Sequence, residues 1–278
     1  MSRTAGKVVV FGSLSQDLHL DMPRHPHSGE TVMSGDIAYR FGGKGANQAI
    51  AAARAGAASV FIGKVGNDLH GNEYVDRLGR FGVDTSKMEI VEGAPTGTAI
   101  IYVDSAGENM IVVAPGANFR NGLEDLTRLD SYSAGDVLLM PLELPLDVVA
   151  QAARKAAGQG MRVIINLAPY ARMPADVLRL CDPVIVNEHE AQLLHESGMT
   201  TLSLLVTLGA NGSRWGEHAV PAIAQEPIDT TGAGDAYCGT LAARLALGER
   251  PEQAMTAASR AAAECVAHQG AQPDLPTP

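Results

Sequence analysis

The segment "DTTGAGDAYCGTLAARLALG" (229–248) joins a glycine-rich turn to a predicted helix that carries one carboxylate, Asp235, near its start. The first N–H groups of a helix have no acceptor within it, and the helix dipole adds partial positive charge there. We therefore expect an anion site over 231–235. In such a site Asp235 can accept a proton from a hydroxyl while the N–H groups hold a transferring phosphoryl group. Alternatively, Asp235 only caps its helix.

A second glycine cluster lies in "RFGGKGANQAIAAARAGA" (40–57), where glycines flank Lys44 and Asn47 follows in the first turn of a predicted helix. The spacing is not that of a Walker A loop. It favours a pocket in which backbone N–H groups and the Asn47 amide reach a polyhydroxylated ligand. Taken alone, the glycine cluster is more typical of a plain tight turn that leads into a helix.

The elements that must position these clusters form an alternating pattern. Short apolar runs rich in Val and Ile predict buried strands at 7–12, 59–66, 136–143, 162–169, 182–188 and 202–209. Alanine-rich segments with helical spacing occur at 46–57, 145–160 and 250–270. Continuous apolar strands that alternate with helices are typical of a parallel sheet covered on both faces. We predict a three-layer α/β/α sandwich with a mostly parallel central sheet, forming one domain over 1–278.

Two segments, about 15–41 and 97–113, interrupt this alternation. Both contain turns, alternating polarity and β-branched residues without an intervening helix. Such segments are typical of antiparallel excursions with one wetted face. We expect them to form a small β-sheet lid.

Composition narrows the class of protein. The formal charge is −10, from 21 basic and 31 acidic side chains, which argues against non-specific binding to nucleic acid or to anionic membranes. Three scattered cysteines, Cys181, Cys238 and Cys265, favour a reducing compartment over a disulfide framework. No apolar stretch is long enough to predict a membrane span or a signal peptide. The expected location is the cytoplasm.

Together and in this order, the two glycine clusters closely resemble the two signature regions of the ribokinase family of carbohydrate kinases, which also includes fructokinases and adenosine kinases. Further matches, "FGSLSQDL", "APGAN", "NLAP", "VNEHEA", "TLGANGS" and "GAQP", extend the resemblance over nearly the whole chain. It implies a ribokinase-like fold and transfer of the γ-phosphate of ATP to a primary hydroxyl of a small free sugar, with ribose the first candidate.

The resemblance also assigns site residues. Asp235 would be the catalytic base, and the anion hole would comprise Gly232, Ala233 and Gly234. The sugar contacts would be Ser15, Asp17, Gly43, Lys44, Asn47 and Glu143.

The remaining assignments concern the nucleotide and two ions. Nucleotide contacts would be Asn187, Thr207, Gly209, Gly212 and Ser259. Glu190 would support a water-bound Mg²⁺ together with Asn187. A monovalent cation, K⁺, would be held by Asp229, Thr231, Gly270 and Asp274.

The chain departs from the family pattern at three places. Ser15 stands where ribokinases have Asn, and serine offers one donor in place of an amide, which leaves the sugar open between ribose, 2-deoxyribose and a ketohexose. Ribokinases have a helix near 198–203, where this chain has only a few residues, and the chain stops soon after "GAQP". Apolar surface left uncovered there would be buried by a partner subunit or would weaken ATP binding.

Other functions fit the same pattern. A nucleoside kinase would need an apolar platform for a base, and the lid offers only Tyr39, Phe41, Tyr102 and Met110. A phosphosugar kinase would need cations such as Arg24, His25, His27 and Arg40. A sugar-binding or regulatory protein without turnover is the candidate from another class. As in relatives that the chain resembles, we expect a homodimer formed through the lid sheets.

Overall fold

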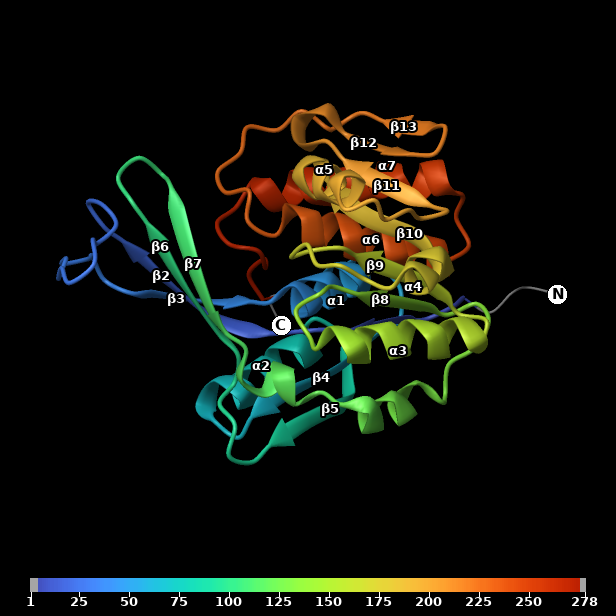
Figure 1. The fold of residues 1–278 in the computed structure, drawn as a ribbon, viewed down its shortest axis with the longest axis horizontal. Coiled ribbons are helices and arrows are strands. Elements are labelled where there is room, and N and C mark those ends of the chain that lie inside the picture. The colour runs from blue at the N-terminus through green and yellow to red at the C-terminus, as the bar shows by residue number, and fades with distance from the viewer. Residues whose placement is uncertain (1–4, 276–278) are drawn as a thin grey trace.

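A nine-stranded, mostly parallel sheet runs through the structure, a computed structural model that describes residues 5–275 (Figure 1). Antiparallel pairing occurs only where β11, β12 and β13 meet. In spatial order the strands are β13 (His218–Val220), β12 (Ser213–Trp215), β11 (Leu204–Thr207), β10 (Cys181–Asn187), β9 (Arg162–Asn166), β8 (Val137–Met140), β1 (Val8–Phe11), β4 (Ser59–Gly66) and β5 (Asp84–Val91). All six predicted strands are present, whereas β5, β12 and β13 were not predicted.

Helices cover both faces of this sheet, which confirms the predicted three layers. One layer contains α1 (Lys44–Arg54), α2 (Leu69–Arg80), α6 (Ala233–Ala246) and α7 (Pro251–Val266). The other contains α3 (Leu146–Gly158), α4 (Ala175–Leu180), α5 (Glu188–Glu196) and the short helix η2 (Leu123–Leu129). Side chains of β1 alternate between the layers: Val8 and Val10 face the first, and Val9 and Phe11 face the second.

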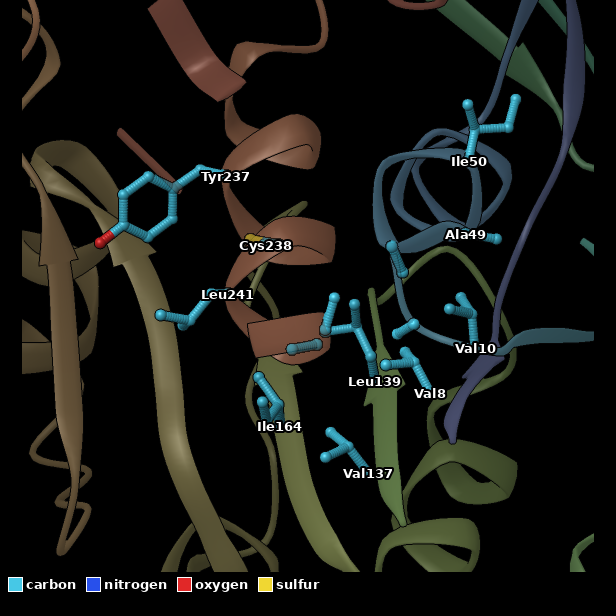
Figure 2. Close-up of a cluster of buried hydrophobic side chains, with 14 of the residues drawn as sticks. Val8, Val10, Ala49, Ile50, Val137, Leu139, Ile164, Tyr237, Cys238 and Leu241 are labelled. Atoms are coloured by element: carbon cyan, nitrogen blue, oxygen red, sulfur yellow. The ribbon is translucent and has the colours of Figure 1, made fainter. Parts of the chain in front are cut away.

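The core under α1 and α6 fixes where these two helices begin. Figure 2 shows Val8, Val10, Val137, Leu139 and Ile164 on the strands, with Ala49 and Ile50 of α1 and Leu241 of α6 packed nearby. Burial of each aliphatic side chain of this kind stabilises the folded state by about 1.5–3 kcal/mol. This packing holds the first turns of α1 and α6 at the carboxyl ends of the central strands.

Four strands form a separate sheet, which we call the lid: β3 (Ala38–Gly42), β2 (Ser15–Asp21), β6 (Thr98–Val103) and β7 (Asn109–Ala114), in this order. In Figure 1 the lid projects to the left of the main sheet. The β2–β3 and β6–β7 pairs are antiparallel, as predicted, but β2 and β6 join them in parallel. The two strands meet at the base of the lid, where Gln16 N–H donates to Gly97 C=O at 2.8 Å, and they run in the same direction from there.

The segment between α5 and β11 contains no helix, as the sequence indicated. Its Leu202 is 81% exposed, so this connecting segment carries an uncovered apolar side chain. Among residues 5–275, no helix is both long and apolar enough to cross a membrane.

Candidate functional site

The order of the strands reverses at β1. From β1 the chain continues to β4 and β5 on one side, and later returns to β8, β9, β10 and β11 on the other. In open parallel sheets, ligands bind at the carboxyl ends of the strands beside such a reversal. Here residues after β1 and β8 and at the end of β9 contact the start of α1, and side chains of α1 in turn contact the first turn of α6.

Asp235 is the third residue of α6 and is buried, with 6% of its surface exposed. Its carboxylate accepts two amide hydrogen bonds of 2.9 Å, from Asn47 Nδ2 to Oδ2 and from Gln48 Nε2 to Oδ1. The residue at the N-cap of α6 is Gly232. The carboxylate is thus held by side chains of α1, an arrangement that simple capping of α6 does not explain.

The turn before Asp235 presents backbone donors. Gly232 has φ 79°, and a Cβ there would lie 2.4 Å from the Cβ of Ala271, so only glycine is accommodated. The N–H of Ala233 donates to Thr230 C=O at 3.3 Å. Within the described residues, no acceptor takes the N–H groups of Gly232, Gly234 or Asp235. Two of the three predicted anion-hole residues therefore offer free donors, and Asp235 adds a third.

The first turn of α1 binds a second carboxylate. Gly43 has φ 88°, and a Cβ there would lie 2.4 Å from Leu14 Cα, so the backbone passes close to the residues after β1. This approach lets Lys44 N–H donate to Glu143 Oε2 at 3.0 Å. The Ser13 hydroxyl also donates to Glu143. Glu143 is therefore fixed at the start of α1, in the same region as Asn47.

Lys44 supplies positive charge to this group of acids. Its pKa is raised, chiefly by Asp235 and also by Glu143 and Glu190. Burial raises the pKa of both Glu143 and Glu190, and the Lys44 ammonium partly offsets that effect in each. The Lys44 side chain thus compensates three carboxylates at once.

Asp17 on β2 brings a further acid from the lid. Burial raises its pKa to about 6, against the opposing effect of the Ser15 hydroxyl, which donates to Asp17 Oδ1 at 2.6 Å. The negative charges of Glu143 and Asp235 raise it further. Ser15 is therefore engaged by Asp17.

A cavity of about 830 Å³ lies next to the anion hole. Thr207, Gly209, Gly212 and Ser259, predicted from the sequence to contact a nucleotide, all line it together with Ala233 and Gly234. Tyr237 forms part of the wall, and its hydroxyl is 2.7 Å from that of Ser213. This volume is within the range of small-molecule sites.

Asn187 and Glu190 form a capping box at the start of α5. Asn187 N–H donates to Glu190 Oε2, and Glu190 N–H donates to Asn187 Oδ1, both at 2.8 Å. The Glu190 carboxylate uses only one oxygen in this pair and lies among other acids. Oxygen donors of this kind suit Mg²⁺ that keeps its waters. These residues therefore fit the Mg²⁺ that the resemblance implies.

The residues proposed for K⁺ are only partly together. Asp229 accepts hydrogen bonds of 2.9 Å from the N–H groups of Thr231 and Gly270. Asp274 is exposed and lies near the guanidinium of Arg77, where its charge partly offsets the lowering of the Arg77 pKa by burial. Asp229, Thr231 and Gly270 are in contact, but the contacts are hydrogen bonds that Thr231 and Gly270 donate to Asp229. Among residues 5–275, no cluster of three or more His, Cys, Asp or Glu could hold a metal.

The sequence reasoning missed several side chains that support the site. Gln48 donates to Asn166 Oδ1 at 3.2 Å as well as to Asp235. Gln272 donates to Asn47 Oδ1 at 2.9 Å and to the Tyr74 hydroxyl at 2.7 Å. Ser13, Gln48 and Gln272 lie inside the motifs "FGSLSQDL", "GANQA" and "GAQP", so these motifs already contained the signal.

Comparison with known proteins gave the following matches. The family model described as pfkB family carbohydrate kinase matches residues 5–278. A ribokinase of Bacillus subtilis is 35% identical over 97% of this chain and 96% of its own. The crystal structure of a Thermotoga maritima ribokinase superposes with a TM-score of 0.86 at 27% identity, covering 95% of this chain and 94% of that one. The structure of Arabidopsis thaliana ribokinase complexed with ribose and ATP also gives 0.86, at 29% identity over 96% and 95%.

Proposed function

Because the chain belongs to the pfkB family of carbohydrate kinases, we propose that it transfers the γ-phosphate of ATP to a primary hydroxyl of a small free sugar, ribose first. One observation carries this proposal. The buried Asp235 carboxylate, held by two amides, lies beside three unpaired N–H groups, and the residue that carries one of them, Gly234, lines a cavity large enough for a nucleotide. The ribose and ATP bound by the Arabidopsis relative agree with this assignment.

In this mechanism Asp235 accepts the proton of the sugar hydroxyl as its oxygen attacks the γ-phosphate. The N–H groups of Gly232, Gly234 and Asp235 stabilise the charge on the transferring group. Asn47 and Gln48 keep the carboxylate oriented. When bound, Mg²⁺ neutralises charge on the nucleotide phosphates; Glu190 and Asn187 would hold it through water.

The sugar would lie between the lid and the first turn of α1. Asp17 and Glu143 can accept hydrogen bonds from neighbouring hydroxyls, and Lys44 and Asn47 can donate. Gly43 lets the backbone approach the ring. The Ser15 hydroxyl donates to Asp17 and so orients a carboxylate that would accept hydrogen bonds from the sugar. The substrates to test therefore still include 2-deoxyribose and a ketohexose.

Three of the lid side chains considered for the alternative substrates, Phe41, Arg24 and Arg40, already have partners within the protein. Phe41 packs edge-on against Tyr74, with Arg77 over its ring, so it offers no open platform for a base. Arg24 forms an ion pair with Glu30, and Arg40 forms one with Asp229. These arginines are therefore already engaged by acids and are poorly suited to a sugar phosphate.

A coupled assay of ADP release tests the proposal. Purified protein is supplied with ATP and Mg²⁺ and with ribose, 2-deoxyribose, fructose, adenosine, inosine or fructose 6-phosphate in turn. We expect release with a free sugar at least ten times faster than with any nucleoside or sugar phosphate. Binding of a sugar in a thermal-shift assay, without ADP release from any compound, would instead support a non-catalytic sugar-binding protein.

The raised pKa of Asp17 predicts a pH effect on sugar binding. Asp17 is ionised above pH 6 and neutral below it, and the neutral form loses part of its capacity as an acceptor. The KM for the sugar should therefore rise several-fold between pH 7.5 and pH 5.5. Steady-state kinetics over this range check the result. In Asp17→Asn the KM should be high at both values, and an equally steep rise in that variant would show that another group titrates.

The raised pKa of Asp17 also affects the stability of the fold. The pKa of Asp17 rises from 3.8 when unfolded to about 6 when folded, so its contribution to stability falls as pH rises through this window. Asp17→Asn should therefore raise the melting temperature at pH 7.5 and have little effect at pH 4.

For the quaternary structure we propose a homodimer formed through the lid. β7 is an edge strand, and its apolar residues Met110, Ile111, Val112 and Val113 are each more than half exposed. An exposed apolar edge strand of this kind is normally covered, and a second copy of the same strand matches it in length and polarity.

Val112→Lys should convert this dimer to a monomer, because the ammonium would have to be buried in the interface. Sedimentation equilibrium of the wild type and the variant measures the change. Leu202→Lys is the matched control, since Leu202 is an exposed apolar residue far from the lid. A dimer lost in the control but kept in Val112→Lys would place the interface at the segment without a helix.

For location we propose a reducing compartment, the cytoplasm. Cys181, Cys238 and Cys265 are all buried and unpaired, as is usual where thiols stay reduced.

A further inference from the structure

Arg40 links the lid to the segment that leads into the anion hole. It lies on β3, and its side chain reaches Asp229, with Nη1 3.3 Å from Oδ2. Nη2 is 3.5 Å from Gln269 Oε1. The stem also packs near Gly270, where an added Cβ would lie 3.6 Å from Arg40 Cδ. A residue of the lid thus contacts both segments in which K⁺ binding was expected.

Both oxygens of the Asp229 carboxylate accept hydrogen bonds from the protein. Oδ1 accepts from Thr231 N–H, and Oδ2 accepts from Gly270 N–H and from the guanidinium of Arg40. A cation at this carboxylate would lie among three hydrogen-bond donors, and the Arg40 guanidinium already brings positive charge to it. The second expected carboxylate, Asp274, lies apart beside Arg77. The residues present therefore fit a monovalent cation poorly, and we assign none to Asp229.

We propose that the guanidinium of Arg40 takes the place of a monovalent cation at Asp229 and positions the segment before the anion hole. The link to the chemistry is short, because Asp229 orients Thr231 and Thr231 directly precedes Gly232. Arg40 touches no reacting atom and acts as a positioning residue. The effect on catalysis rests on the proposed kinase activity, whereas the exclusion of a cation does not.

The kinetic test compares the wild type with Arg40→Ala and Arg40→Lys in K⁺, Na⁺ and tetramethylammonium buffers of equal ionic strength. Wild-type kcat should vary by less than twofold among the three. Arg40→Ala should lose at least tenfold in tetramethylammonium and recover most of this loss in K⁺, while Arg40→Lys should keep most of its activity. Arg24→Ala, another arginine of the lid segment paired with a glutamate, is the control and should behave as the wild type.

A thermal-shift titration with KCl against tetramethylammonium chloride, without substrates, tests cation exclusion independently. K⁺ should raise the melting temperature of Arg40→Ala but not that of the wild type. Activation of the wild type by K⁺ of fivefold or more, or a K⁺-dependent shift in its melting temperature, would overturn the proposal, as would full activity of Arg40→Ala in tetramethylammonium. If no sugar supports turnover, the proposed kinase function fails, and the thermal-shift result still decides the cation question.

Discussion

Asp235→Asn is expected to lower kcat by about 10³-fold or more, because the amide cannot accept the proton of the attacking hydroxyl. The shape of the side chain is kept, so the KM values for sugar and ATP should change less than fivefold. One of the two amide donors from Asn47 and Gln48 will lose its acceptor. Such a loss costs about 1–3 kcal/mol, so the variant should fold with a moderately lower melting temperature.

Single-turnover kinetics at saturating ATP measure the chemical step directly. The control is Asp147→Asn, since Asp147 is also an acid in the first turn of a helix, α3, but is exposed and outside the site. It should retain wild-type turnover. Wild-type turnover in Asp235→Asn itself would remove Asp235 as the base.

Lys44→Met is expected to lower kcat/KM by at least 10²-fold and to destabilise the fold. The substitution leaves Asp235, Glu143 and Glu190 without the ammonium that compensates them. Removing one partner from a buried charge group costs about 3–5 kcal/mol. The penalty should be largest at pH 7.5 and decrease toward pH 5.5, because burial already raises the pKa of Glu143 and Glu190 and protonation then relieves the repulsion.

Thermal melts and steady-state kinetics of Lys44→Met and Lys44→Arg at both pH values check this result. Lys44→Arg keeps the charge and should recover most of the stability but only part of the activity, since its planar head is larger. If Lys44→Met were as stable as the wild type at pH 7.5, Lys44 would not be the group that balances these acids.

The parts of the fold that sequence predicts are those set by local patterns. Runs of Val and Ile identified β1, β4 and β8–β11, and alanine-rich spacing identified α1, α3 and α7. The strand β5 was missed because its first four residues, 84–87, are all polar and it follows a helix, α2, that carries several charged side chains. The parallel pairing of β2 with β6 joins segments about 80 residues apart, and no local signal contains that information.

For the site, the motifs named most of the residues but not their partners. Sequence reasoning placed Asp235 in an anion site of backbone donors but did not predict what holds its carboxylate, which accepts hydrogen bonds from side-chain amides of α1, 187 and 188 residues away. Asp274 was grouped with Asp229 by motif, yet it is exposed and lies near Arg77. Such pairings depend on how whole elements pack, so the pattern at either residue alone does not determine them.

The hydrogen bonds of Gln272 connect the segment around residue 272 to the catalytic site, so this segment can report whether the site is occupied. Gln272 binds Asn47, Asn47 binds Asp235, and the Arg77 guanidinium holds Gln272 from the other side at 2.7 Å. A substrate that restricts the motion of Asp235 will also restrict the motion of the backbone around Gln272. Deuterium uptake by a peptide spanning 268–275 should therefore slow when substrate binds, and it would report site occupancy from a peptide that contains neither the base nor the anion-hole residues.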